Sequence, residues 1–373
     1  MDIQTLKHLN EADWCARKYA WRRLRRVLIS PNNSTGSVGW ALAEVEPEEF
    51  GLPASDGWGI AMPEDMSSRS PSLSQTSLPF TSLPYFITNM FSQLRNWLLK
   101  SYLRTPDHPC KYRVVKWLGK VVFPSSGVRA SAYPELDLML HPRDWIEYLL
   151  LQGRRYEPLT LDFLKSNLRT GDCAILAGVN FGQHVAVAAR AVGISGRVIG
   201  IEPQPAALLK ARENLRLNGL SRQVMLLSLA LGRKTELLSM AWSLEENSGA
   251  ASLLDKGEGL TVQAVPLSVV IKSMCPRTPR LLLLDVQGFE SEVLAGMACD
   301  QLPEIVVVEI DRGFLARAGT TQDEIFAALV RYGYQLYALD GRHASPGQIE
   351  LLEQNVVGLL AGVRPNWSSS LSD

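Results

Sequence analysis

The segment AILAGVNFGQHVAVAARAVG, Ala174 to Gly193, constrains the fold of this chain more than any other stretch. Its residue pattern predicts a buried strand, a tight turn and then a helix with one apolar face. Gly178 and Gly182 let the main chain turn sharply and approach a ligand closely, because glycine has no side chain. The helix that begins at Gly182 has free amides, which favour an anionic group such as a carboxylate. The pattern predicts a ligand-binding turn, and an ordinary tight turn is the alternative.

The alternation of strand and helix continues through the rest of the chain. Apolar strands are expected at RVIGIEP, QVMLLSLAL, RLLLLDV, EIVVVEI and YQLYALD, and NVVGLLAGV fits a final strand. Near-continuous apolar strands that alternate with helices predict an α/β fold with a doubly wound, mostly parallel sheet covered on both faces. The short connection DGRHASPGQIELLEQ before the final strand allows that strand to be antiparallel.

In an open sheet of this kind, ligands bind beyond the carboxyl ends of the strands, near the point where the strand order reverses. The expected strands place the glycine turn, Glu202, Ala230, Asp285 and Glu309 along this edge. A carboxylate such as Glu202, about 20 residues after the turn, can accept hydrogen bonds from both hydroxyls of a ribose. Considered alone, Glu202 would be interpreted as a surface carboxylate, and the glycine turn before it favours a ligand contact instead.

Two ligands fit the turn and Glu202: a dinucleotide and S-adenosylmethionine. A dinucleotide site favours the spacing G-x-G-x-x-G, which lets a pyrophosphate reach the start of the helix. Asn180 stands at the middle glycine position, and no glycine follows at the third. S-adenosylmethionine carries no phosphate, so the sequence favours it. A nicotinamide-dependent oxidoreductase is the less favoured alternative.

Several motifs occur in one order between Val128 and Val363: GVNFG, IEPQP, ENLRLNGL, LALG, NSGAASL, LLDVQGFESEVLAGM and EIVVVEI. With these motifs the chain resembles the FkbM-type methyltransferases, class I enzymes that use S-adenosylmethionine and mostly methylate hydroxyl oxygens. The resemblance implies a seven-stranded, Rossmann-like fold and a hydroxyl acceptor on a small molecule or a glycan or lipid precursor. It also implies a cofactor site built from Gly178, Asn180, Gly182, Glu202, Pro203 and Ala230.

Asp285, in the motif DVQGFE, is the first candidate for the base that takes the proton of the acceptor hydroxyl. The structural alternative is a carboxylate that caps the helix beginning near Phe289. His184, in the first turn of the helix after the glycine turn, is a second catalytic candidate, and a packed or amide-bonded histidine is its alternative. Asp285 with Glu290 is weak evidence for a divalent cation, so no metal site is predicted.

The sequence departs from the family pattern at Leu176, at PLSVV in place of an acidic run, at Leu283 and, mildly, at Gln287, and the first and third of these bear on the function. Leu176 stands where the family usually carries an acidic residue, and Leu283 stands where a lysine is often found. These departures favour a second hypothesis, a binding or regulatory protein that keeps the fold without turnover. The intact DVQGFE motif favours an enzyme.

The first part of the chain differs from the rest. Residues 1–84 are expected to form a partly disordered extension, with a basic helix over 14–28 and a linker rich in serine and proline over 67–84. The basic helix either packs on the body or makes a weak membrane-surface contact. Residues 85–127 are expected to be a helical packing or lid segment, followed by the methyltransferase domain over 128–363 and a tail over 364–373.

Composition limits the classes of partner and compartment. The 38 Lys and Arg residues balance 38 Asp and Glu residues, so total charge gives no reason to expect a nucleic-acid partner. The five cysteines are scattered without a CxxC pair, which indicates reduced thiols. The first residues lack the order of a secretory signal, and no apolar run reaches the roughly 18 residues of a membrane span. A cytoplasmic enzyme is therefore expected.

Overall fold

A computed structural model of the chain describes residues 83–122, 127–241, 259–345 and 351–367. The chain divides into two compact units, residues 1–88 and residues 89–373, and the second contains nearly all of the described structure. The predicted basic helix over 14–28, most of the predicted linker and the NSGAASL motif lie outside the described residues.

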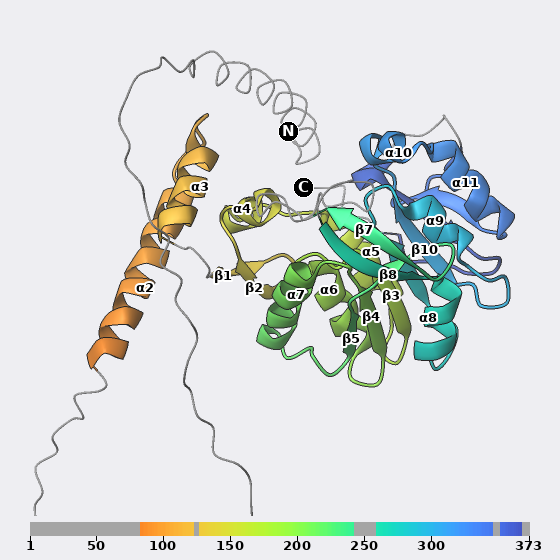
Figure 1. Ribbon diagram of the computed structural model, residues 1–373, viewed down its shortest axis with the longest axis horizontal. Coiled ribbons are helices and arrows are strands. Elements are labelled where there is room, and N and C mark those ends of the chain that lie inside the picture. Colours follow the sequence, from red (N-terminus) through yellow and green to blue (C-terminus); the bar gives the residue numbers. More distant parts are fainter. Residues whose placement is uncertain (1–82, 123–126, 242–258, 346–350, 368–373) are drawn as a thin grey trace, which may run out of the picture. The chain divides into compact units, whose positions relative to one another are not determined.

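A seven-stranded sheet forms the centre of the second unit (Figure 1). Its strands lie in the order β11 (Gln335–Ala338), β12 (Asn355–Leu359), β10 (Ile305–Glu309), β9 (Leu281–Leu284), β3 (Cys173–Ala177), β4 (Arg197–Ile201) and β5 (Val224–Leu227). Six of these strands run in the same direction, and β12 runs opposite to them, antiparallel to both β10 and β11. The prediction of a doubly wound, mostly parallel sheet of seven strands is confirmed.

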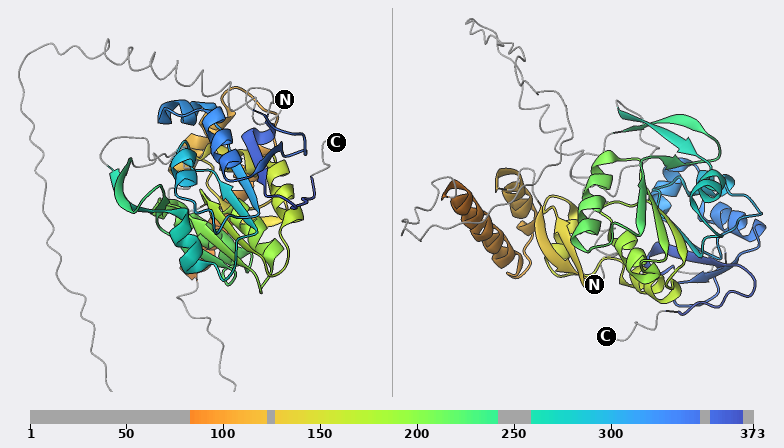
Figure 2. Two further views of the ribbon diagram at one scale, coloured as in Figure 1. Left: turned by 90° about the vertical axis from the view of Figure 1, so that its right-hand side faces the viewer. Right: turned by 90° about the horizontal axis from the view of Figure 1, so that it is seen from below.

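Helices cover both faces of this sheet, because each strand is apolar on both sides (Figures 1 and 2). Ala174 and Leu176 of β3 pack into one core cluster, and Ile175 and Ala177 pack into the other. The first cluster includes side chains of α5 (Pro158–Asn167), α6 (Gln183–Val192) and α7 (Pro205–Leu217). The second includes side chains of α8 (Leu267–Met274), α9 (Glu290–Ala295), α10 (Arg312–Ala318) and α11 (Gln322–Arg331).

Local signals in the sequence set the ends of several helices. Pro205 occupies the first turn of α7, and Gly219, with φ +68°, follows its last turn in the left-handed conformation. Thr321 and Glu324 form the expected capping box at the start of α11.

One expected strand is divided in the structure. The segment QVMLLSLAL leaves the central sheet after β5, and Ala230 and Leu231 form β6 in a separate three-stranded sheet with β8 (Gly259–Val265) and β7 (Glu236–Ala241). Ala230 pairs with Ala264 of β8 rather than with β4. The expectation of a single strand was therefore wrong, because the chain changes sheets at residues 228–229.

The elements before β3 are helices and one hairpin. In the described residues they are α2 (Leu83–Leu103), α3 (Lys111–Val122), the antiparallel pair β1 (Val128–Ala132) and β2 (Leu136–Leu140), α4 (Trp145–Leu151) and α5. The ring of Tyr112 in α3 packs against Trp145 and Tyr148 of α4, and its hydroxyl donates to the carbonyl of Arg143. Across the described part of the chain, none of the helices combines the length and the apolar character that a bilayer span requires.

Candidate functional site

The glycine turn follows β3 and connects it to α6. Gly178 has φ +90°, and its N–H donates to the carbonyl of Ile201 at the end of β4. A Cβ atom on Gly178 would overlap the carbonyl oxygen of Asp285, which follows β9. Gly182 has φ +92° and begins α6, where a Cβ atom would lie 3.0 Å from the Cα of Ala211 in α7. The contact with Asp285 excludes a side chain at Gly178, and the positive φ together with the close approach of α7 disfavours one at Gly182.

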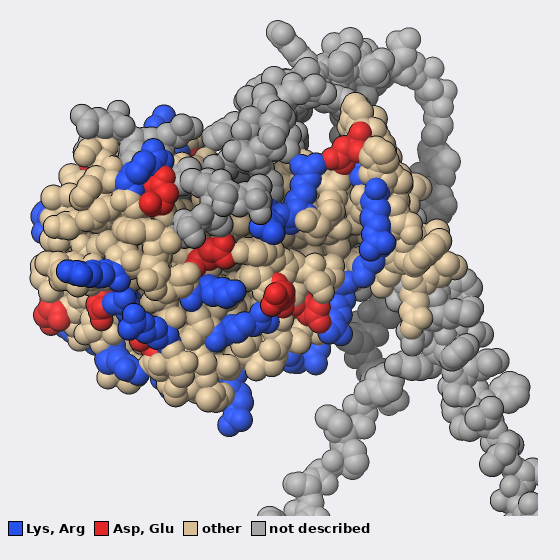
Figure 3. Space-filling model, turned by 180° about the vertical axis from the view of Figure 1, so that it is seen from behind, with Lys and Arg blue, Asp and Glu red and all other residues tan. Residues whose placement is uncertain are grey.

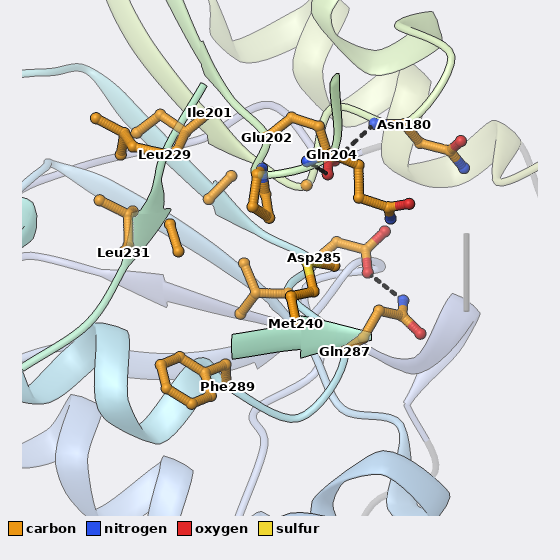
Figure 4. Close-up of a pocket in the computed structure, with 15 residues that line it drawn as sticks. Asn180, Ile201, Glu202, Gln204, Leu229, Leu231, Met240, Asp285, Gln287 and Phe289 are labelled. Carbon is orange, nitrogen blue, oxygen red and sulfur yellow. Dashed lines mark hydrogen bonds between the residues drawn. The ribbon is translucent and has the colours of Figure 1, made fainter. Parts of the chain in front are cut away.

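Glu202 follows β4 and is held by the loops on either side of it. Its Oε2 atom accepts a hydrogen bond from the N–H of Asn180 at 3.3 Å, and its Oε1 atom accepts one from the N–H of Gln204 at 3.0 Å (Figure 4). Burial raises the pKa of this carboxyl to about 7, although the backbone donors of Gln204, Asn180 and Val179 oppose that shift. A carboxylate has about four lone-pair sites, so Glu202 can still accept a hydrogen bond from a ligand.

Asp285 follows β9 and faces the same space from the other side of β3. Its Oδ1 atom accepts a hydrogen bond from the side-chain amide of Gln287 at 2.6 Å, and that amide also lies 3.2 Å from Oε2 of Glu309. Helix α9 begins at Glu290, whose carboxylate accepts the N–H groups of Val286 and Gly288. Glu290, rather than Asp285, is therefore the carboxylate that binds the free amides before this helix.

Gly178, Glu202, Asp285 and Gln287 line one cleft at the carboxyl ends of the strands, where the strand order reverses between β3 and β9. The cleft encloses about 600 Å³, including open solvent at its mouth. Figure 4 shows the polar side chains of the cleft at one end and its apolar side chains at the other. The polar end has Asn180, Gln204, Asp285 and Gln287, and the apolar end includes Ile201, Leu229, Leu231 and Phe289.

The structure brings most of the predicted site residues together. Of the predicted cofactor residues, the lining includes Gly178, Asn180, Glu202, Pro203 and Ala230. Gly182 starts the helix behind the turn and is absent from the described lining. Ala230 reaches the cleft from β6. Glu202 and Asp285 are the two carboxylates among the described residues that line it.

His184 does not line this cleft. Its Nε2 atom lies 3.1 Å from Oε2 of Glu157, which precedes α5, and its ring packs edge-on against Tyr156. Burial works to lower the pKa of His184, but the carboxylates of Glu157, Asp285 and Glu353 raise it overall. His184 is absent from the described lining of the cleft, and its catalytic role stays a prediction.

Several residues of this region were not identified from the sequence. Met240 and Phe289 complete the apolar end of the cleft, and Met240 arrives on β7 of the small sheet. Glu353, with φ +49°, accepts the N–H groups of Leu159 and Thr160 at the start of α5. These contacts link positions almost 200 residues apart, so no local pattern could reveal them.

Leu176, at the position where an acidic residue was expected, is fully buried in β3 and does not line the cleft. Among the residues that the structure describes, no group of three or more His, Cys, Asp or Glu side chains could hold a metal ion.

Comparisons with known structures return many chains of similar fold. A SAM-dependent O-methyltransferase from Thermotoga maritima is 14% identical over 57% of this chain and 68% of its own, with a TM-score of 0.33. A TehB-like SAM-dependent methyltransferase from Corynebacterium glutamicum is 13% identical over 57% of this chain and 91% of its own, with a TM-score of 0.35. An O-methyltransferase from Bacillus cereus, in complex with SAH, is 11% identical over 54% of this chain and 78% of its own, with a TM-score of 0.32.

No curated protein matches the sequence significantly. The identities and TM-scores of the similar structures are too low to assign a function to this chain. The match to a sequence family assigns the domain instead. Residues 177–336 match the family described as Methyltransferase FkbM domain, and this range contains the glycine turn after Ala177, Glu202 and Asp285. The family predicted from the motifs is therefore confirmed, and residues 177–336 of this chain are a methyltransferase domain of the FkbM family.

Proposed function

We propose that this chain is an S-adenosylmethionine-dependent O-methyltransferase that methylates a hydroxyl group of a small molecule or of a glycan or lipid precursor. The observation that carries the proposal is the placement of Glu202 and Asp285 in one cleft, one on each side of the glycine turn. Glu202 offers carboxylate acceptors near the turn, and Asp285 offers a proton acceptor at the polar end. Cofactor binding and proton transfer are thereby assigned to different carboxylates.

The residues of the cleft fit S-adenosylmethionine. Glu202 would hold the two ribose hydroxyls, because its oxygens retain lone pairs after accepting the backbone N–H groups of Asn180 and Gln204. The apolar end, with Leu229 and Phe289, would hold the adenine ring away from water. When bound, this cofactor supplies a methyl group on a positively charged sulfur, which is a good leaving group.

Asp285 would orient the acceptor hydroxyl and take its proton as the oxygen becomes bonded to the methyl group. Gln287 fixes the aspartate, because its amide donates to Oδ1 and leaves Oδ2 for the acceptor. Positioning supplies much of the rate in such a displacement, so a rigid aspartate is favourable.

His184 has a supporting part in this proposal. Its contact with Glu157 and the neighbouring carboxylates favour the protonated ring. In its protonated form the ring would balance part of the negative charge of Asp285 and Glu353. The histidine therefore acts as a positioning residue, and the acid–base candidate in the cleft is Asp285.

The test is incubation of the purified chain with S-adenosylmethionine labelled in its methyl group and an extract of the source cells. We expect label to pass to a product whose methyl group is bound to oxygen, with release of S-adenosylhomocysteine. Thermal-shift measurements with S-adenosylmethionine, S-adenosylhomocysteine and NAD separate the ligands in the same preparation. Stabilisation by S-adenosylmethionine with no labelled product would favour the non-catalytic alternative, to which Leu176 and Leu283 point. Stabilisation by NAD alone would refute the proposal.

A further inference from the structure

Among the side chains that the structure describes on α2 and α3, five large apolar ones lie exposed. They are Leu94, Trp97 and Leu98 on α2, and Val114 and Trp117 on α3. The two tryptophans are 63% and 60% exposed, although tryptophan is usually well buried in a folded chain. An exposed group of this kind marks a surface that binds something, whereas single exposed apolar residues need no explanation.

Their spacing shows that these side chains are separate from the packing faces of the helices. Positions 94, 97 and 98 follow the i, i+3, i+4 pattern and form one stripe on α2, while Leu99 and Leu103 of the same helix are buried. Val114 and Trp117 likewise share one side of α3, and Val115 is buried. Each helix therefore has a second apolar side that the described protein leaves open.

Positive charge accompanies these exposed side chains. Lys100 and Arg104 are exposed three and seven residues after Trp97, and Arg113 is exposed four residues before Trp117. Residues 93–119 carry six Lys and Arg residues and one Asp: Arg95, Lys100, Arg104, Lys111, Arg113 and Lys116 against Asp107. The whole chain has no net charge, so this segment is a local excess. Figure 3 shows Lys and Arg side chains beside a broad uncharged surface over these helices.

The single acidic residue of this segment does not reduce the charge of the exposed surface. Asp107 accepts hydrogen bonds from Lys111, Gln152 and Arg154, which fix it at the junction between α2 and α3. Lys111 is buried there and also donates to the carbonyl of Leu103. The exposed cations therefore face solvent without a carboxylate of their own segment.

We propose that α2 and α3 form a docking surface for a membrane rich in anionic phospholipid. Tryptophan and leucine side chains favour the boundary between headgroups and acyl chains, because tryptophan combines an apolar ring with a polar N–H group. Lysine and arginine extend their charged ends to the headgroups while their stems lie along the apolar surface. This docking surface, defined as Leu94, Trp97, Leu98, Val114 and Trp117 with Lys100, Arg104 and Arg113, is independent of the chemistry proposed for the cleft.

Charge also distinguishes this partner from two others. A second copy of the chain, docked symmetrically through the same surface, would bring like charges together in an apolar contact. A nucleic acid would satisfy the cations, and Trp97 and Trp117 could stack on its bases, but Leu94, Leu98 and Val114 would find no apolar partner on it. An anionic membrane satisfies both the apolar side chains and the cations.

The experiment is vesicle flotation of the full chain. One set of vesicles contains only phosphatidylcholine, and the other contains phosphatidylcholine with phosphatidylserine. We expect binding to the anionic vesicles, weakened by added salt, and little binding to the neutral vesicles. The triple variant Lys100→Gln, Arg104→Gln, Arg113→Gln should bind about 100-fold more weakly, at about fivefold for each charge. The double variant Trp97→Ala, Trp117→Ala should bind at least about tenfold more weakly.

Matched controls remove the same kinds of group elsewhere on the surface. Lys165→Gln with Arg331→Gln removes two exposed cations, and Leu209→Ala removes an exposed apolar side chain of α7. Both controls should bind like the parent chain, and thermal unfolding should show that every variant is folded.

Three results would overturn the proposal. The first is no binding of the parent chain to anionic vesicles. The second is parent-like binding by both surface variants, which would assign the membrane contact to another segment such as residues 14–28. The third is self-association, seen by sedimentation, or RNA binding, seen by gel shift, that the surface variants abolish while the parent chain binds no vesicles.

Discussion

Replacement of Glu202 by alanine tests the proposed cofactor site most directly. The carboxylate sits at the end of β4, 6% exposed, with one backbone hydrogen bond on each oxygen. Hydrogen bonds to a charged group contribute about 1.5–3 kcal/mol each. Loss of two bonds to the ribose hydroxyls should therefore weaken binding by at least about 3 kcal/mol, or about 150-fold.

The same change should leave the fold intact. Burial raises the pKa of Glu202 from its ordinary value of 4.5 to about 7. The folded chain therefore holds this proton more tightly than the unfolded chain, so ionisation of the group removes stability as the pH rises from 4.5 to about 7. Above that range the loss is complete and constant. At about pH 8 the alanine variant no longer buries this charge but loses the hydrogen bonds from the N–H groups of Asn180 and Gln204, so the two effects oppose each other and its Tm should stay within about 5 °C of the parent chain's.

Isothermal titration with S-adenosylhomocysteine measures the affinity, and thermal unfolding measures the fold. Asp300→Ala is the matched control, because it removes a carboxylate whose side chain is 68% exposed and does not line the cleft. The control should bind like the parent chain. A folded Glu202→Ala variant with unchanged affinity would refute the assignment of Glu202 to the ribose.

Three further predictions concern pH, the glycine turn and the aspartate. The ionised form of Glu202 is the better hydrogen-bond acceptor, so affinity for S-adenosylhomocysteine should fall as the pH drops below about 7, approaching about tenfold per pH unit. Titrations across this pH range should show a much shallower pH dependence of affinity for the variant Glu202→Gln. An equally steep pH dependence in that variant would contradict the assignment. Gly178→Ala should lower the free energy of unfolding in urea by more than about 3 kcal/mol, because its Cβ meets the carbonyl of Asp285. Gly333→Ala, at φ +87° with no atom within 4 Å of the added Cβ, should cost only the left-handed strain of about 1–2 kcal/mol, and an equal loss in the two variants would count against the packing argument. Asp285→Asn should lower kcat about 100- to 10,000-fold while S-adenosylhomocysteine still binds, as measured by product release and titration; a parent-like kcat would exclude the aspartate as the base.

The fold was predictable because its signals are local and repeated. Apolar strands alternate with amphipathic helices, and proline, glycine and the Thr321 capping box mark helix ends. The glycine turn and Glu202 were predictable for the same reason, since each directly follows a strand. The short connection before β12 was consistent with an antiparallel strand. Its position between β10 and β11 could not be predicted, because it depends on pairing between distant segments.

The rest of the candidate site depends on contacts between distant segments. Glu353 binds the start of α5, and Glu157 holds His184 outside the cleft. Met240 reaches the cleft because the chain leaves the central sheet after Leu227 and builds a second sheet. The reason for glycine at Gly178 is also non-local, because the atom that excludes a side chain belongs to the turn after β9.

The position of β12 has a consequence for how this domain is made. It is the last strand of the described chain, yet it lies inside the sheet, hydrogen-bonded to β10 on one side and β11 on the other. During synthesis, β10 and β11 are made before β12. Until β12 pairs with them, the edges that will face it have unpaired N–H and C=O groups. The domain can close only when residues 355–359 leave the ribosome, so a chaperone that shields strand edges has its main opportunity in that interval.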